Sequence, residues 1–162
     1  MKNQKVLFLT QGAMIAALYV ILTFIANAFG LANYVIQVRF SEALTILPFF
    51  TPAAIPGLFV GCILSNILTG CMPLDIIFGS LATLIGAVLA YAVRKYKWLV
   101  PVPNIISNTI IVPFVLAYVY QFEGSIPYFM LTVGLGEIIS GGILGMILLH
   151  ILEKYNLFKM HF

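Results

Sequence analysis

The sequence predicts an all-α integral membrane protein, and three observations carry this prediction. Of the 162 residues, 62% are hydrophobic and only 8% are charged, whereas a soluble domain usually carries about 25% charged residues. Long stretches contain no Asp, Glu, Lys or Arg, namely residues 6–38, 43–74, 76–93 and 98–122. These stretches do not alternate between polar and apolar residues, so they predict membrane-spanning helices rather than the strands of a barrel.

The same composition excludes several classes of protein. The 8 basic and 5 acidic residues are too few to cover the surface of a water-soluble domain, which excludes a soluble enzyme, a nucleic-acid-binding protein and a disordered chain. The sequence contains no motif typical of nucleotide binding, metal binding or a catalytic nucleophile. We therefore expect a multi-pass protein of the cell membrane that is not an enzyme and uses no cofactor.

Six helices are expected in a single membrane domain over residues 1–162. The first covers about 6–28. The uncharged run 43–74 is split because Pro48, Pro52 and Pro56 lie within nine residues and interrupt any helix there. The run therefore predicts a short second helix and a third helix, and the remaining runs predict three more. The expected ranges of these five helices are about 41–50, 53–69, 75–93, 101–121 and 127–153.

The basic residues predict the orientation of these helices. Seven of the eight cations form three clusters: Lys2 and Lys5; Arg94, Lys95 and Lys97; Lys154 and Lys159. Basic residues favour the cytoplasmic side of a membrane. Six helices place all three clusters on that side, whereas a single span over 43–74 would separate the first two. Both termini are therefore expected to be cytoplasmic, with four charged residues on the outer side: Arg39, Glu42, Asp75 and Glu123.

Glu137 is the most informative polar residue. It is the single charge within residues 124–152 and lies about ten residues into the last predicted helix, roughly 15 Å from its outer end. Four glycines surround it: Gly134, Gly136, Gly141 and Gly142. A carboxylate at this depth is costly and typical of a functional site. Either Glu137 contacts a ligand, or it makes a structural hydrogen bond to a neighbouring helix.

Five other polar residues are candidates for the same site, each with a structural alternative. Arg39 and Glu42 are spaced for an ion pair that either fixes a loop or contacts a substrate. Asp75 lies at the start of the fourth predicted helix, where the helix dipole alone favours a carboxylate. Asn66 and Asn108 lie well inside predicted helices, where an amide either bonds to another helix or contacts a ligand.

Small residues recur at a spacing of four in two predicted helices. Range 6–28 contains two overlapping pairs, Gly12 with Ala16 and Ala13 with Ala17. Range 53–69 contains a longer series: Ala53, Gly57, Gly61, Ser65 and Thr69. Such stripes permit close helix packing. The third helix is therefore expected to be central, whereas the first packs either inside the protein or against a partner in the membrane.

Several segments resemble the QueT family of membrane transporters. The resemblance rests on VRFSEAL at 38–44 and LPFFTPAAIPG at 47–57, together with LDIIFGSLATL at 74–84 and VGLGE at 133–137. It covers nearly the whole chain. QueT proteins are substrate-binding S components of energy-coupling factor (ECF) importers, assigned to queuosine precursors.

The resemblance implies a six-helix S-component fold with a site open to the outside, in the bacterial cytoplasmic membrane. It implies three partner chains, namely a transmembrane coupling subunit (EcfT) and two ATPase subunits that energise transport. It also implies an AxxxA motif in the first helix that docks on the coupling subunit, and Ala13 and Ala17 match that motif. An S component for another small vitamin or nucleobase, or an assembly subunit without a transported ligand, are the alternatives.

The implied ligand suits the candidate residues chemically. Queuosine precursors such as preQ0, preQ1 and queuine are 7-deazaguanines, whose N1–H and 2-amino group form an edge with two donors. A carboxylate accepts from both donors at once, which makes Glu137 the candidate for this edge. Asn108 is expected on the O6 or ring-nitrogen side, and Arg39 on a loop that closes over the ligand. An aminomethyl substituent would add a cation for Glu42, Asp75 or Glu137.

Overall fold

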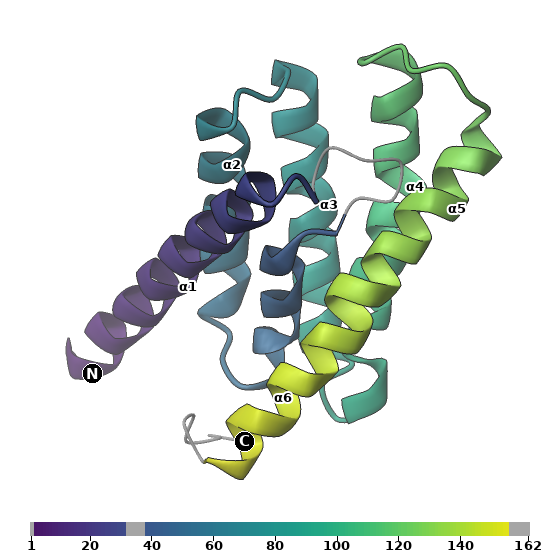
Figure 1. Cartoon of the computed structure of the whole chain (residues 1–162). Coiled ribbons are helices and arrows are strands. Elements are labelled where there is room, and N and C mark those ends of the chain that lie inside the picture. Colours follow the sequence, from purple (N-terminus) through teal and green to yellow (C-terminus); the bar gives the residue numbers. More distant parts are fainter. Residues whose placement is uncertain (1, 32–37, 156–162) are drawn as a thin grey trace.

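The structure is a computed structural model that describes residues 2–31 and 38–155 (Figure 1). These residues form helices joined by short connections, and no strand occurs among them. The elements in chain order are α1 (Lys2–Ala28), the 3-10 helix η1 (Phe40–Phe49), α2 (Ala54–Leu68), α3 (Pro73–Ala92), the 3-10 turn η2 (Lys97–Leu99), α4 (Val102–Tyr118), α5 (Ile126–Glu137), the π-helical segment η3 (Ile138–Leu144) and α6 (Gly145–Lys154). The all-α prediction is confirmed for this part of the chain.

Among the described residues, four helical segments are long and apolar enough to cross a membrane: Asn3–Ala28, Pro73–Ala92, Lys97–Tyr118 and Ile126–Lys154. The last of these is continuous in the ribbon and comprises α5, η3 and α6 (Figure 1). The two other apolar helices, η1 and α2, are shorter. The expected helices at 41–50 and 53–69 correspond to these two. The run is broken at residues 50–53, which include Pro52, whereas Pro48 lies inside η1 and Pro56 in the first turn of α2.

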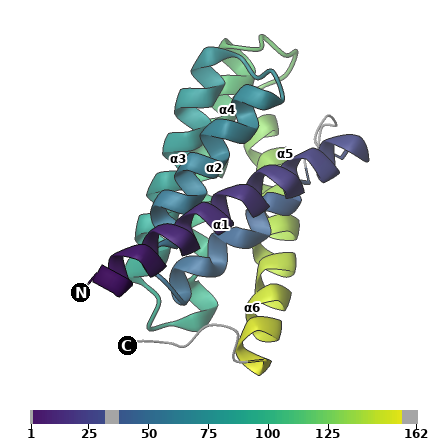
Figure 2. The same cartoon turned by 90° about the vertical axis from the view of Figure 1, so that its left-hand side faces the viewer.

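The three parts of the chain that carry or adjoin the basic clusters lie at one end of the bundle. The N-terminus, the connection between α3 and α4, and the end of α6 lie at the lower end of Figure 1 and stay together after rotation (Figure 2). Lys97 and Glu153 form an ion pair that ties the α3–α4 connection to α6. Lys159 and residues 32–37 lie outside the described residues. The side of the membrane that this end faces stays a prediction.

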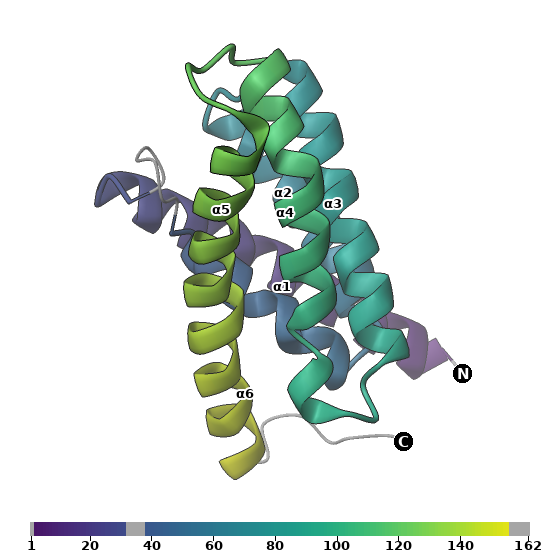
Figure 3. The ribbon, with the colours of Figure 1, turned by 90° about the vertical axis from the view of Figure 1, so that its right-hand side faces the viewer.

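The centre of the bundle is occupied by η1. Figure 3 shows this short helix behind α4 and α5, and α1 crosses on its far side. Residues 41–49 are all buried, and Leu44, Ile46 and Leu47 pack into the main hydrophobic core with α1, α2 and the end of α6. Glycines of the last helical segment allow η1 to approach, because a Cβ at Gly145 would lie 3.0 Å from Ile46 Cγ2. The sequence around Glu42 is therefore inside the protein.

Close packing of α1 on α2 depends on the small-residue series in α2. A Cβ atom at Gly57 would lie 2.7 Å from the Gly12 carbonyl oxygen, and one at Gly61 would lie 2.8 Å from Tyr19 Cβ and 3.0 Å from Ala16 Cα. Gly12 and Ala16 thus face α2. This contact confirms that α2, the third predicted helix, is tightly packed in the protein.

Gly61→Val is expected to separate α1 from α2. The nearest atoms belong to helix backbone and Cβ positions, which cannot move aside as a flexible side chain does. Overpacking usually costs about 1–3 kcal/mol, and we expect the upper part of that range. Thermal unfolding in detergent, followed by circular dichroism, measures the change. Leu64→Val is the control, because it adds a β-branched residue to the same helix at an exposed position; equal unfolding temperatures for both variants would contradict the packing.

Candidate functional site

The regular hydrogen bonding of the last long helix changes directly after Glu137. Residues Ile138–Leu144 are π-helical, and π-turns inside helices occur frequently at functional sites. The Ser140 hydroxyl accepts a hydrogen bond from the Arg39 backbone N–H at 3.1 Å. Gly141 faces the start of η1, since a Cβ there would lie 3.7 Å from the Glu42 carbonyl oxygen. Two irregular helices, η1 and η3, therefore meet at Glu137.

Glu42 and Glu137 lie side by side in the protein interior. Asn104 of α4 bridges them, because its Nδ2 lies 2.9 Å from Glu42 Oε2 and 3.3 Å from Glu137 Oε2. The Tyr19 hydroxyl of α1 donates to Glu42 Oε1 at 2.5 Å. Asn104 is fully buried, and Tyr19 and Glu42 are 1% and 2% exposed. Four elements, namely α1, η1, α4 and the end of α5, thus supply one polar cluster.

Two carboxylates this close in a buried place need compensating positive charge. Burying one charge without a partner costs several kcal/mol, and two like charges add their repulsion. The Arg39 guanidinium lies within electrostatic range of both Glu42 and Glu137. The cluster therefore combines two acceptor groups with one cation, an arrangement suited to a polar ligand that carries donors.

Asn108 lies one helical turn beyond Asn104 and beside Glu137. Its side chain is 4% exposed, yet its Nδ2 makes no hydrogen bond of good geometry to any described residue. A buried donor without a partner is costly, and such groups call for an explanation. Asn108 thus presents an amide donor next to a carboxylate acceptor.

A second polar cluster lies at the upper end of the bundle. The Tyr120 hydroxyl donates to Asp75 Oδ2 at 2.8 Å and accepts from the Met72 backbone N–H at 3.3 Å. Burial of the phenol, together with its bond to Asp75, raises the pKa of Tyr120 above the usual value, so Tyr120 stays a donor at neutral pH. Asn66 lies nearby, since a Cβ at Gly79 would be 3.4 Å from both Asn66 and Asp75.

The structure therefore groups the predicted residues in two sets. Glu42, Asn108 and Glu137 come together, whereas Asn66 and Asp75 belong to the second cluster. The charge of Arg39 acts on Asp75 as well as on Glu42. Arg39 thus acts electrostatically on both clusters.

Glu42, which the charge pattern places on the outer side of the membrane, is 2% exposed, because η1 folds into the centre of the bundle instead of lying at the membrane boundary. Asp75 is also only 6% exposed, beneath Tyr120.

Sequence reasoning missed Tyr19 and Asn104. Asn104 and Asn108 are four residues apart and so share a helix face, and this spacing was a usable signal. Tyr19 is one of 8 tyrosines, and nothing local distinguishes it. Among the described residues, no three His, Cys, Asp or Glu side chains are grouped so that they could hold a metal ion.

Tyr19→Phe is expected to destabilise the protein by about 1–3 kcal/mol, because it removes the donor to a buried carboxylate oxygen. Unfolding in detergent measures the effect. Tyr118→Phe is the matched control, since Tyr118 is 70% exposed and loses only a solvated or interfacial hydroxyl. An unchanged unfolding midpoint for Tyr19→Phe would show that Glu42 does not depend on this hydrogen bond.

The two small-residue pairs of α1 differ in their exposure. Gly12 and Ala16 face α2, whereas Ala13 and Ala17 are exposed. The structure thus resolves the alternative for the first pair, which packs inside the protein. Ala13 and Ala17 remain available on the outer face of α1, which crosses the bundle obliquely (Figure 2).

Comparison with known proteins agrees with this architecture. The family model described as QueT transporter matches residues 9–154. A curated relative from Lactococcus lactis subsp. cremoris (strain MG1363), named queuosine precursor transporter QueT, is 38% identical over 85 residues. That alignment spans about half of each chain, 52% of this one and 50% of the relative. No solved structure matches the chain. Because the family model covers almost all of the membrane bundle, this multi-pass membrane protein belongs to the QueT transporter family.

Proposed function

We propose that the chain is the substrate-binding subunit of an ECF-type importer for a queuosine precursor. Its membership of the QueT transporter family supports a transport role, and the name of the Lactococcus lactis relative supports this class of substrate. In this proposal six helices cross or enter the bacterial cytoplasmic membrane, both termini are cytoplasmic, and the ligand arrives from outside. The basic end of the bundle in Figure 1 then faces the cytoplasm.

The observation that carries the proposal is the pairing of Glu137 with Asn108. A 7-deazaguanine presents its O6 acceptor beside the N1–H and 2-amino donors. The Asn108 amide, which lies beside Glu137 and makes no hydrogen bond of good geometry, would supply a donor for O6, and the Glu137 carboxylate would supply acceptors for the two N–H groups. Charge-assisted hydrogen bonds of this kind are stronger than neutral ones. The two side chains therefore complement one edge of the base.

The second carboxylate suggests which precursor is preferred. Glu42 and Glu137 share one amide donor, Asn104 Nδ2, and Arg39 is the cation that acts on them. A precursor with an aminomethyl group would bring a second cation, which favours the charged form of neighbouring carboxyl groups. A neutral precursor with a nitrile in that place does not. We infer that the aminomethyl compound binds more tightly than the nitrile.

Import requires energy that this bundle does not provide by itself. In the proposed assembly, a coupling subunit contacts α1 through Ala13 and Ala17, and two ATPase subunits drive reorientation of the whole bundle. Small residues on an exposed helix face allow another helix to approach closely. The free Ala13–Ala17 face supports this contact.

Ligand binding to the purified protein tests the proposal. Binding to the native state raises apparent stability by mass action, so thermal unfolding is measured with a panel of free bases and vitamins and followed by calorimetry. We expect stabilisation by 7-deazaguanines, strongest for the aminomethyl compound. Stabilisation by another nucleobase or vitamin alone would reassign the substrate. No stabilisation by any compound would favour an assembly subunit without a transported ligand.

A further inference from the structure

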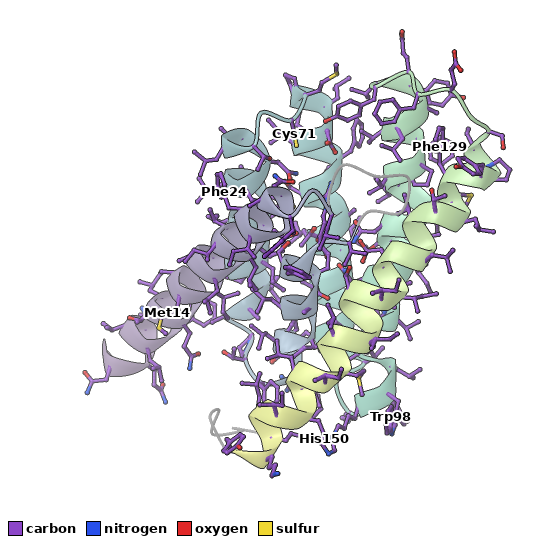
Figure 4. The ribbon with its side chains drawn as sticks, in the orientation of Figure 1. Met14, Phe24, Cys71, Trp98, Phe129 and His150 are labelled. Atoms are coloured by element: carbon purple, nitrogen blue, oxygen red, sulfur yellow. The ribbon has the colours of Figure 1, made fainter. Side chains whose placement is uncertain are left out.

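Asn104 is packed against the backbone of α3 at Gly86. A Cβ atom at Gly86 would lie 2.5 Å from Asn104 Oδ1 and 2.8 Å from Asn104 Cα, so a residue with a side chain leaves no room for Asn104 in this place. The helix α3 runs from the upper end of the bundle, near Cys71, to the lower end, near Trp98 (Figure 4). Gly86 lies in its lower half, where α4 lies beside it (Figure 3).

A hydrogen bond between the two helices holds them together beside this contact. The Ser107 hydroxyl of α4 donates to the Ala82 carbonyl oxygen of α3 at 3.0 Å, and Ala82 lies about one helical turn before Gly86. Asn104 itself is fully buried. The close approach of α4 to α3 at Gly86 therefore determines where the Asn104 side chain lies.

The contact with Gly86 also sets the orientation of the Asn104 amide. Its Oδ1 faces Gly86 and makes no hydrogen bond to a described residue. Its Nδ2 lies 2.9 Å from Glu42 Oε2 and 3.3 Å from Glu137 Oε2. An amide nitrogen carries two N–H donors, so one is available for each carboxylate. The reverse orientation would place an acceptor oxygen against both of them.

We propose that Gly86 and Asn104 are positioning residues for the ligand site: Gly86 admits Asn104, and the Asn104 amide holds the Glu137 carboxylate in the place from which it meets the base. A fixed donor limits the freedom of the flexible Glu137 side chain before the ligand arrives, which favours binding. The same donor keeps Glu42 and Glu137 together against the repulsion between like charges. This inference rests on the proposed function, and neither positioning residue touches the ligand.

Gly86→Ala tests the first step, because it leaves every polar side chain of the site unchanged. The added Cβ would overlap Asn104 Oδ1 and Cα, so the amide must shift. We expect the affinity for 7-deazaguanine, measured by calorimetry on the purified protein, to fall at least about tenfold, as for the loss of one hydrogen bond to a charged group. Unsubstituted 7-deazaguanine is the probe because it carries no cation that Glu42 could bind.

Gly79→Ala is the matched control for this variant. It adds the same methyl group to α3 at a position where a Cβ would lie at an ordinary contact distance, 3.4 Å, from the Asn66 and Asp75 side chains. We expect it to keep the affinity of the wild type. An equal loss of affinity in Gly79→Ala and Gly86→Ala would show that any added bulk in α3 has this effect, and would contradict the proposal.

A second set of variants separates positioning from packing, and it decides the question even if Gly86→Ala fails to fold. Asn104→Asp keeps the shape of the side chain but replaces Nδ2 by an acceptor oxygen, and should lower both the unfolding temperature and the affinity. Adding Glu42→Gln exchanges donor and acceptor between these two positions, while the remaining oxygen at position 42 still accepts from Tyr19. We expect the double variant to regain most of the unfolding temperature but not the affinity, because Glu137 has no donor at position 104.

Glu42→Gln alone is the reference for affinity, since Asn104 still faces Glu137 in that variant. The double variant should bind 7-deazaguanine at least about tenfold more weakly than this reference, and equal affinities would show that Asn104 serves packing only. Wild-type binding that neither Gly86→Ala nor Asn104→Asp weakens would overturn the positioning role while the proposed function stands. A wild type that binds no 7-deazaguanine would overturn the proposed function and the role of these two residues with it.

Discussion

Glu137→Gln is expected to weaken binding of a 7-deazaguanine at least tenfold while the protein still folds. The substitution keeps the shape of the side chain but replaces one acceptor oxygen by an NH2 donor, which then faces the donors of the ligand. Truncating one side of a buried, charge-assisted pair costs about 2–5 kcal/mol, equivalent to roughly 30- to 4,000-fold in affinity.

The folded state should tolerate this change. Glu137 shares Asn104 Nδ2 with Glu42, so Glu137→Gln removes one of two neighbouring negative charges and the cost of burying it. Calorimetry on the purified variant measures affinity, and thermal unfolding measures stability. Asp75→Asn is the control, because Asp75 bonds to Tyr120 in the second cluster. Unchanged affinity in Glu137→Gln, with a loss in Asp75→Asn, would move the base-reading role to Asp75.

Ala17→Trp is expected to abolish uptake and assembly with the coupling subunit while the isolated chain keeps its ligand affinity. Ala13 and Ala17 are exposed on α1, and a bulky residue there prevents a partner helix from approaching closely. Ala13→Leu should act in the same way. Co-purification with the coupling and ATPase subunits, uptake into cells, and ligand binding by the isolated subunit are the three measurements.

Two further variants test whether this effect is specific to the exposed face of α1. Ile77→Trp places the same bulk on an exposed position of α3 and should leave assembly intact. Ala16→Leu lies on the buried face of α1, 7% exposed and against Gly61, and should destabilise the isolated subunit instead. If complexes form normally with both Ala13→Leu and Ala17→Trp, the exposed face of α1 is not the docking surface.

Much of the helical pattern was predictable because the bilayer imposes it. A chain in hydrocarbon must satisfy its own backbone hydrogen bonds, so each long uncharged run contains a helix. Pro52 lies at the break between η1 and α2, where proline removes a backbone donor. Glu137 and Asn108 stood out for a related reason: a charge or amide within an apolar run is costly unless it has a purpose.

The π-helical turn after Glu137 and the 3-10 form of η1 were not predictable in this way. Both depend on contacts between segments far apart in the sequence, such as the bond from the Arg39 backbone to Ser140, 101 positions later. The burial of Glu42 has the same origin. Its neighbours in sequence suggest a residue at the membrane surface, and only the insertion of η1 among the other helices takes it inside.

The sequence by itself determined that this is a helical membrane protein, where its helices begin and end to within a few residues, and that Glu137 lies deep within one of them. These properties depend on the length of each uncharged stretch and on the position of residues within it. Only the tertiary structure decided that Tyr19 and Asn104 join Glu42 and Glu137, and which small-residue pair of α1 stays free. These outcomes depend on which helix faces meet, and the spacing of residues along one helix does not specify the partner of each face.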